Sequence, residues 1–112
     1  MTDALRIEDV PAESRYEARV GTALAGWVDY RRTGAGTHRR LVALHTEVVA
    51  EFGGRGIGRE LVRHVIAAAR ASSERIRPVC PLFASHFERH PEDRDVLAPG
   101  RWQAPDREER RS

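Results

Sequence analysis

Four glycines fall within the six positions from Gly53 to Gly58 and give this stretch the clearest chemical meaning in the chain. Glycine is used where the backbone must take a positive φ or approach a ligand closely. An amphipathic run follows, so the stretch is expected to open a helix, whose N-terminus offers free N–H groups and a partial positive charge. This combination is typical of a phosphate-binding loop.

Two common phosphate loops do not fit the spacing. A Walker loop ends in Gly-Lys followed by Ser or Thr, whereas Gly58 is followed by Arg59 and Glu60. A dinucleotide-binding fingerprint needs a third glycine at the position of Arg59 and an acidic residue ending a second parallel strand. The stretch is therefore expected to hold another kind of phosphate group, with a helix-capping turn that binds nothing as the alternative.

Three side chains near the loop or near a second predicted helix could take part in acid-base or nucleophilic chemistry. His45 and Glu47 share one face at the end of a predicted strand, and a solvated strand end is the alternative interpretation. Cys80 precedes Pro81, which suits the first position of a helix. The thiol is thus expected at or next to an N-cap, where a thiolate is favoured, with an inert buried cysteine as the alternative.

The elements that must position these residues begin with strands. Residues 5–10, 15–20 and 23–31 show apolar and charged residues in alternation, which predicts an antiparallel meander. Residues 40–49 form the most strand-like run. Its two expected faces are Val42, Leu44, Thr46 and Val48, and Leu41, Ala43, His45, Glu47 and Val49.

Two helices are expected after the glycine stretch, over residues 59–73 and 82–90. Between them, residues 76–80 are short enough for a strand, which Pro78 restricts to a sheet edge. The side chains expected to face the core are Leu61, Val62, Val65, Ile66 and Ala69 of the first helix, and Leu82, Phe83, His86 and Phe87 of the second.

The length of 112 residues and the composition indicate one domain, which is predicted over 5–97 and is followed by a disordered tail over 98–112. All 19 basic residues are arginine, and 17 acidic residues are interspersed with them. Because a nucleic-acid footprint should be a basic stripe on one face, no nucleic-acid partner is expected. No apolar run approaches the ~18 residues of a membrane span, so a cytoplasmic protein without a membrane partner is expected.

Metal binding is not expected. The single cysteine, Cys80, excludes an internal disulfide and a multi-cysteine zinc site. His86 and His90 are four residues apart, but a third ligand is not evident.

The loop and the order of the elements resemble the GNAT N-acetyltransferases, whose loop reads Arg/Gln-x-x-Gly-x-Gly/Ala. Gly53 stands at the Arg/Gln position, and Gly54 to Gly58 match. The similarity is closest to the compact YjdJ-type subfamily, and it covers residues 5–97. It rests on the loop and on His45-Thr46-Glu47-Val48, Val79-Cys80-Pro81 and Arg89-His90-Pro91. The resemblance implies an α+β, GNAT-like fold: a mostly antiparallel sheet with a glycine-loop helix and a C-terminal helix, in shortened form.

The resemblance also implies acetyl-CoA as co-substrate. The strand before the loop would pair its backbone with pantetheine, and the loop amides would hold the pyrophosphate. Arg55 or Arg59 would add a contact to phosphate. The implied cofactor-binding residues are Thr46, Val48, Gly53, Gly54, Arg55, Gly56, Ile57, Gly58 and Arg59.

In the implied reaction an amine attacks the thioester directly, in a ternary complex. Glu47, with His45 beside it, is the expected base, and Cys80 is expected to face the thioester as acid or as acetyl acceptor. Many relatives use a tyrosine of the last helix to protonate the thiolate, but the only tyrosines here are Tyr16 and Tyr30. A non-catalytic acetyl-CoA-binding module is therefore the alternative. The acceptor is expected to be a small-molecule or protein amine, and the protein a monomer or weak dimer.

Overall fold

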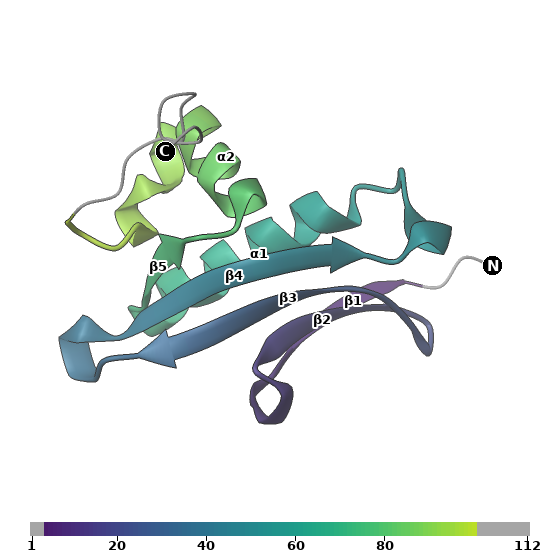
Figure 1. The fold of residues 1–112 in the computed structure, drawn as a ribbon, viewed down its shortest axis with the longest axis horizontal. Coiled ribbons are helices and arrows are strands. Elements are labelled where there is room, and N and C mark those ends of the chain that lie inside the picture. Colours follow the sequence, from purple (N-terminus) through teal and green to yellow (C-terminus); the bar gives the residue numbers. More distant parts are fainter. Residues whose placement is uncertain (1–3, 101–112) are drawn as a thin grey trace, which may run out of the picture.

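The computed structural model describes residues 4–100, which form a five-stranded sheet with two α-helices (Figure 1). The strands are β1 (Leu5–Val10), β2 (Arg15–Val20), β3 (Ala23–Thr33), β4 (Arg40–Val48) and β5 (Arg75–Pro78). The helices are α1 (Ile57–Ser72) and α2 (Pro81–Arg89), with short 3-10 helices η1 (Pro11–Glu13), η2 (Gly36–His38), η3 (Ala50–Phe52) and η4 (Pro91–Val96).

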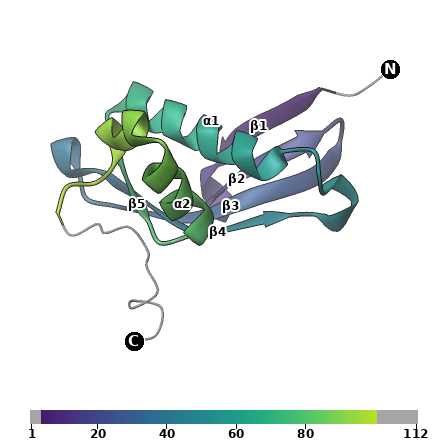
Figure 2. The ribbon, with the colours of Figure 1, turned by 90° about the horizontal axis from the view of Figure 1, so that it is seen from above.

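The strands lie in the sheet in their sequence order, from β1 to β5. β1 to β4 pair antiparallel, which confirms the predicted meander, and β5 runs parallel to β4 after the crossover through α1. α1 lies across the sheet, as the view from above shows (Figure 2). The predicted α+β class with a mostly antiparallel sheet is confirmed.

The core lies between the sheet and the two helices. The predicted apolar stripe of α1 is buried throughout, as are Phe83, His86 and Phe87 of α2. Leu82 was expected in the core but is 37% exposed. It lies at the start of α2 beside Gly58, where a Cβ would be 3.3 Å from the leucine Cδ2, so it packs between the two helix N-termini and not beneath them.

A bulge divides β4 into two halves whose alternation is out of phase. Asp29 pairs with His45 and the next residue, Tyr30, with Ala43, so Leu44 is an extra residue on β4. Leu41 and Ala43 face the core before the bulge, and the core-facing positions after it are Thr46 and Val48. The predicted common face for Val42, Leu44, Thr46 and Val48 is therefore wrong, because a bulge shifts the phase by one residue.

Several element bounds differ from those predicted. α1 begins at Ile57, two residues before the predicted position 59, so the last glycine of the loop is already helical. β5 ends at Pro78, which leaves Cys80 outside the strand. The backbone N–H of Ala98 donates to the Ile76 carbonyl and the residue is 4% exposed, so the packed chain extends past 97. The rest of the predicted tail, 101–112, lies outside the described residues.

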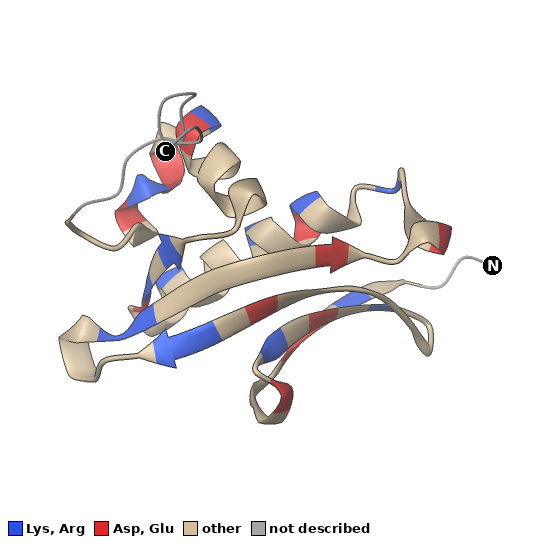
Figure 3. Cartoon of the chain, viewed as in Figure 1, with Lys and Arg blue, Asp and Glu red and all other residues tan. Residues whose placement is uncertain are grey.

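Charged residues are unevenly placed along the sheet. In Figure 3, segments of β3, β4 and β5 that are coloured blue for arginine lie together at one end of the sheet, away from the loop that leads into α1. Within residues 4–100 neither helix is long and apolar enough to cross a membrane.

Candidate functional site

The predicted site lies where β4 runs on without β5. The two strands pair only from Arg40 beside Arg75 to Ala43 beside Pro78. The N–H groups of Val79 and Cys80 then both donate to the Ala43 carbonyl, at 3.1 and 2.8 Å, as the chain turns into α2. Residues 44–48 of β4 thus have β3 on one side and, within the described part of the chain, no strand on the other.

Backbone groups of Thr46 and Val48 point to this open edge. The Val49 N–H donates to the Ala25 carbonyl of β3 at 2.8 Å. The Glu47 carbonyl comes so close to β3 that a Cβ on Gly26 would lie 2.7 Å from it. Because successive residues of a strand direct their N–H and C=O groups to opposite sides, Thr46 and Val48 direct theirs away from β3.

The glycine loop joins this edge to the N-terminus of α1. Gly54 and Gly56 take φ values of 80° and 75°, a region in which other residues are strained. Gly56 is the N-cap of α1, and no side chain caps the helix there. The N–H groups of the first turn, which include Ile57 and Gly58, therefore remain available to an anion.

The two arginines of the loop region have different surroundings. The Arg55 guanidinium lies over the Phe52 ring, 5.1 Å from its centroid. Arg59 lies beside Gly56 and, with Arg63, lines a cavity of about 380 Å³ between α1 and α2. Its other lining residues are His86, His90, Glu92 and Asp93. Arg59, one of the two predicted phosphate contacts, thus lies next to a cavity.

His45 and Glu47 lie together on one face of β4, as predicted. That face points away from α1, so the prediction that they share it with Leu41 and Ala43 is wrong. The His45 Nε2 and a Glu47 carboxylate oxygen are 2.8 Å apart, and both side chains are half exposed. Trp27 and Asp29 of β3 stand beside them in register, and the Trp27 Nε1 donates to Asp29 at 3.3 Å. Sequence reasoning missed these two residues, because only the register of β3 against β4 brings them to the pair.

Cys80 and Thr46 meet on the other side of the open edge. Cys80 is the N-cap residue of α2, as predicted, and is 3% exposed. Its Sγ lies 3.4 Å from the Thr46 Oγ1. Thr46 faces the core and its neighbours His45 and Glu47 face away, so the edge of β4 has a thiol on one side and an imidazole–carboxylate pair on the other.

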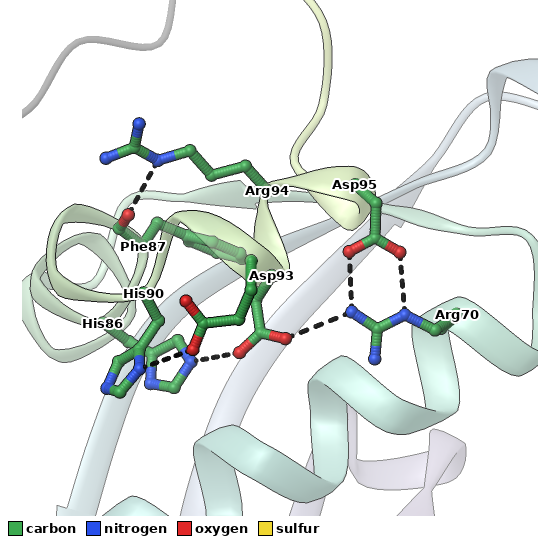
Figure 4. Close-up of polar contacts among 8 residues, drawn as sticks. Arg70, His86, Phe87, His90, Asp93, Arg94 and Asp95 are labelled. Carbon is green, nitrogen blue, oxygen red and sulfur yellow. Dashed lines mark hydrogen bonds and ion pairs between the residues drawn. The ribbon is translucent and has the colours of Figure 1, made fainter.

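A polar network fixes α2, and with it Cys80, against α1 (Figure 4). Asp93 of η4 accepts hydrogen bonds from the His86 Nε2 at 2.8 Å and from Arg70 of α1 at 3.2 Å. Arg70 also donates twice to Asp95, at 2.7 and 2.6 Å. The hydrogen bond from His86 lowers the pKa of the Asp93 carboxyl, and Arg70 lowers it further. This network was not predicted, since nothing in the sequence placed residues 91–96 beside α1.

The two histidines four residues apart are His86 of α2 and His90, the C-cap residue of that helix. His86 and His90 stack with ring centroids 4.3 Å apart, and each is bonded to a different carboxylate. In the described part of the chain, no group of three or more His, Cys, Asp and Glu side chains is arranged to hold a metal ion.

The sequence model of the GCN5-related N-acetyl-transferase family matches residues 15–96, which are most of the chain. The match includes the open edge of β4, the glycine loop and Cys80. The protein belongs to the GCN5-related N-acetyltransferase family. This establishes the predicted GNAT relationship and an acyltransferase family, whereas the YjdJ-type subfamily stays a prediction. No match is found among curated protein sequences.

Two solved structures share this GNAT fold. One is a GCN5-like protein from Staphylococcus aureus, solved by NMR, with a TM-score of 0.60 and 22% identity over 87% of this chain and 91% of that one. The other is a ribosomal-protein-alanine N-acetyltransferase from Brucella melitensis biovar Abortus 2308. Its TM-score is 0.53, with 19% identity over 82% of this chain and 66% of that one. At 22% and 19% identity, these similarities show that the proteins share a fold.

Proposed function

We propose that this GNAT protein transfers an acetyl group from acetyl-CoA to an amine acceptor in a ternary complex. The observation that carries the proposal is the open edge of β4, which leads directly into the uncapped N-terminus of α1. Pantetheine is an extended chain with two amides and can pair with the free groups of Thr46 and Val48 as an added strand would. The pyrophosphate then falls on the first turn of α1, where an anion is favoured.

The residues proposed to bind acetyl-CoA are the edge and loop residues together, with Arg63 added from the cavity. Arg59 and Arg63 contact the anionic part of the molecule by charge-assisted hydrogen bonds. The full set is Thr46, Val48, Gly53, Gly54, Arg55, Gly56, Ile57, Gly58, Arg59 and Arg63.

The proposed reaction uses the two sides of the β4 edge. An amine nitrogen forms a bond to the acetyl carbon while the bond from that carbon to sulfur breaks. Glu47, assisted by His45, accepts the proton that the amine must lose. Cys80 supports the other side of the reaction by giving its thiol proton to the departing CoA thiolate. In a two-step alternative, its Sγ bonds to the acetyl carbon while the bond from that carbon to the CoA sulfur breaks, its proton passes to the CoA thiolate, and the amine then takes the acetyl group from Cys80. The proposal places this reaction in the cytoplasm, on a monomer or weak dimer.

Calorimetric titration with acetyl-CoA tests the binding step. Gly56→Asp adds bulk and negative charge at the N-cap of α1 and should abolish measurable binding. Gly36→Asp is the matched control, because Gly36 also has a positive φ, of 57°, with open space around it in η2. Equal binding by the two folded variants would refute the assignment of the loop.

The second candidate function is a module that binds acetyl-CoA without catalysis, and the absence of a tyrosine from α2 favours it. A panel of amines with acetyl-CoA and detection of free thiol separates the two functions. The panel should contain polyamines, aminosugars and peptides with a free N-terminal alanine, because the Brucella neighbour is named for that acceptor. Binding without turnover above the uncatalysed rate on every acceptor would establish the module.

A further inference from the structure

The register of β3, β4 and β5 gathers arginines on the sheet face opposite α1, at the end of the sheet away from the glycine loop (Figure 3). Arg31 pairs with Val42, and Val42 pairs with Arg77. One row along, Arg40 pairs with Thr33 and with Arg75. The arginine patch is defined as Arg31, Arg40, Arg75 and Arg77.

The neighbours of each arginine show that the patch faces away from the core. Ile76, between the two arginines of β5, is fully buried, as is Leu41 after Arg40. Because side chains alternate along a strand, the arginines leave their strands on the opposite face. The Arg75 guanidinium then turns to the outer edge of β5, where it donates to the Leu97 carbonyl. Three of the four are exposed and Arg40 is intermediate.

The arginines of the patch form no ion pairs in the described part of the chain. Across residues 4–100, no carboxylate lies within ion-pair distance of any of its four arginines. Arg40 and Arg75 donate instead to the backbone carbonyls of Arg39 and Leu97. Arg75 contributes to lowering the pKa of Asp95, but that carboxylate is bound by Arg70. Arg40 and Arg75 stand directly opposite each other on adjacent strands. Like charges in this position are destabilising, so this pair costs stability unless an external anion binds.

We propose that the arginine patch binds the phosphate backbone of a nucleic acid, without reading its sequence. The two rows of cross-strand pairs are about 6.7 Å apart along each strand, and adjacent strands are about 4.8 Å apart. The arginines therefore form a flat surface with closely spaced hydrogen-bond donors. Guanidinium groups bind phosphate in a bidentate manner. Phosphate contacts of this kind supply essentially all of the affinity of non-specific nucleic-acid binding, and they need no apolar anchor.

The composition of the patch itself favours this partner over an acidic protein or a membrane. Protein interfaces concentrate their energy in apolar and aromatic anchors, and membrane-surface binding is strengthened by apolar insertion. The apolar residue at the centre of the patch, Val42, is only 8% exposed. The patch could not be recognised from the sequence, in which charges of both signs are interspersed. Its arginines come from three strands, and only the sheet brings them together.

The test is the salt dependence of binding to a fluorescent DNA duplex of about 20 base pairs, with two double variants of equal net charge. Arg31→Gln with Arg77→Gln removes two exposed patch residues. Arg6→Gln with Arg89→Gln is the control, because both residues are exposed and lie outside the patch. The patch variant should bind at least ~10-fold more weakly at about 50 mM salt, with a log–log salt slope less steep by about 1.8. The control should change affinity by less than about 2-fold.

Three results would overturn the proposal: no duplex binding by the unaltered protein at low salt, equal losses in the two double variants, or tighter patch-dependent binding to polyglutamate or to phosphatidylserine vesicles. Circular dichroism verifies that each variant is folded. Acetyl-CoA titration of the patch variant should match the unaltered protein, since its substitutions lie outside the acetyl-CoA site, so this test is independent of the proposed acetyl transfer.

Discussion

Glu47 is the residue whose proposed role makes the clearest kinetic prediction. An amine can attack the thioester only after its ammonium form has lost a proton. The exposed Glu47 carboxylate, whose oxygen lies 2.8 Å from the His45 Nε2, is placed to accept that proton. Glu47→Gln should lower turnover ~100-fold and leave acetyl-CoA affinity almost unchanged. Initial rates across pH and a parallel titration measure both effects. Glu8→Gln, which changes an exposed carboxylate of β1, is the control, and identical pH profiles for all three proteins would remove Glu47 from the mechanism.

Cys80 allows a direct test of covalent chemistry. The thiol is 3% exposed beside Thr46, at the point where β5 leaves β4. If it accepts the acetyl group, mass spectrometry of the protein mixed with acetyl-CoA alone should show an added acetyl group, which Cys80→Ala and Cys80→Ser should abolish together with most turnover. Full activity in both variants, with no acetylated protein, would leave Cys80 as a packing residue.

Residue types and spacing were sufficient to find the candidate site but not its arrangement. The glycine spacing located the loop, and Pro81 located the N-cap at Cys80. That Thr46 faces the thiol while His45 and Glu47 face the other side depends on the bulge at Leu44. A bulge of this kind arises from pairing with β3, and no local pattern in β4 encodes it.

Among the elements, η4 is expected to hold α2 in place through Asp93. The carboxylate has a lowered pKa in the folded protein, chiefly because His86 donates to it. The contribution of this carboxylate to the free energy of unfolding is therefore present above the pKa of an unfolded Asp, about 3.9, and is lost as pH falls through its lower pKa in the folded protein. Asp93→Asn should reduce the free energy of unfolding by about 1 kcal/mol near neutral pH and by less at about pH 3.

Urea denaturation at the two pH values measures this difference, with Glu88→Gln of α2 as a control because its carboxylate is exposed. Equal destabilisation by Asp93→Asn at both pH values would show that its charge does not stabilise the fold.

Elements with strong local signals were predicted nearly in full. For the elements that depend on distant partners, a strand was expected over 76–80 but not its parallel pairing with β4, and η4 was not expected. The amphipathic stripe of α1 and the alternation of β2 and β3 are local, and both elements were found. β5 is only four residues long and takes its parallel pairing from the β4–α1–β5 crossover. η4 packs on α1 through ion pairs with Arg70, which is more than 20 residues away in sequence. Such long-range contacts leave no periodic pattern in the amino-acid sequence from which they could be predicted.

For the whole molecule, one partly buried polar cluster is expected to tie the N-terminal strands to the end of α1. Arg32 contacts Glu74, the Tyr30 hydroxyl and Asp9, at 2.9, 2.8 and 3.0 Å. The Glu74 side chain is 6% exposed and would lose its partner in Arg32→Ala. We expect a loss of about 2 kcal/mol, less than the ~3–5 kcal/mol of a fully buried pair, because the side chain of Arg32 is 37% exposed.

Arg31→Ala is the adjacent control, on the opposite face and without an ion pair in the described part of the chain. Unfolding in urea should separate the two variants clearly. Similar midpoints for both would mean that the cluster does not stabilise the fold.

The edge of β4 that no described strand covers is also expected to affect how the protein behaves without its proposed co-substrate. A free strand edge is a template for pairing with another chain and promotes aggregation. Here the edge is bordered by Leu44, Val79 and Leu82, which are 37%, 57% and 37% exposed. A molecule that lies along the edge fills the place that a second protein chain would otherwise take. We therefore expect acetyl-CoA to act as a solubilising agent for this protein, most visibly at high protein concentration.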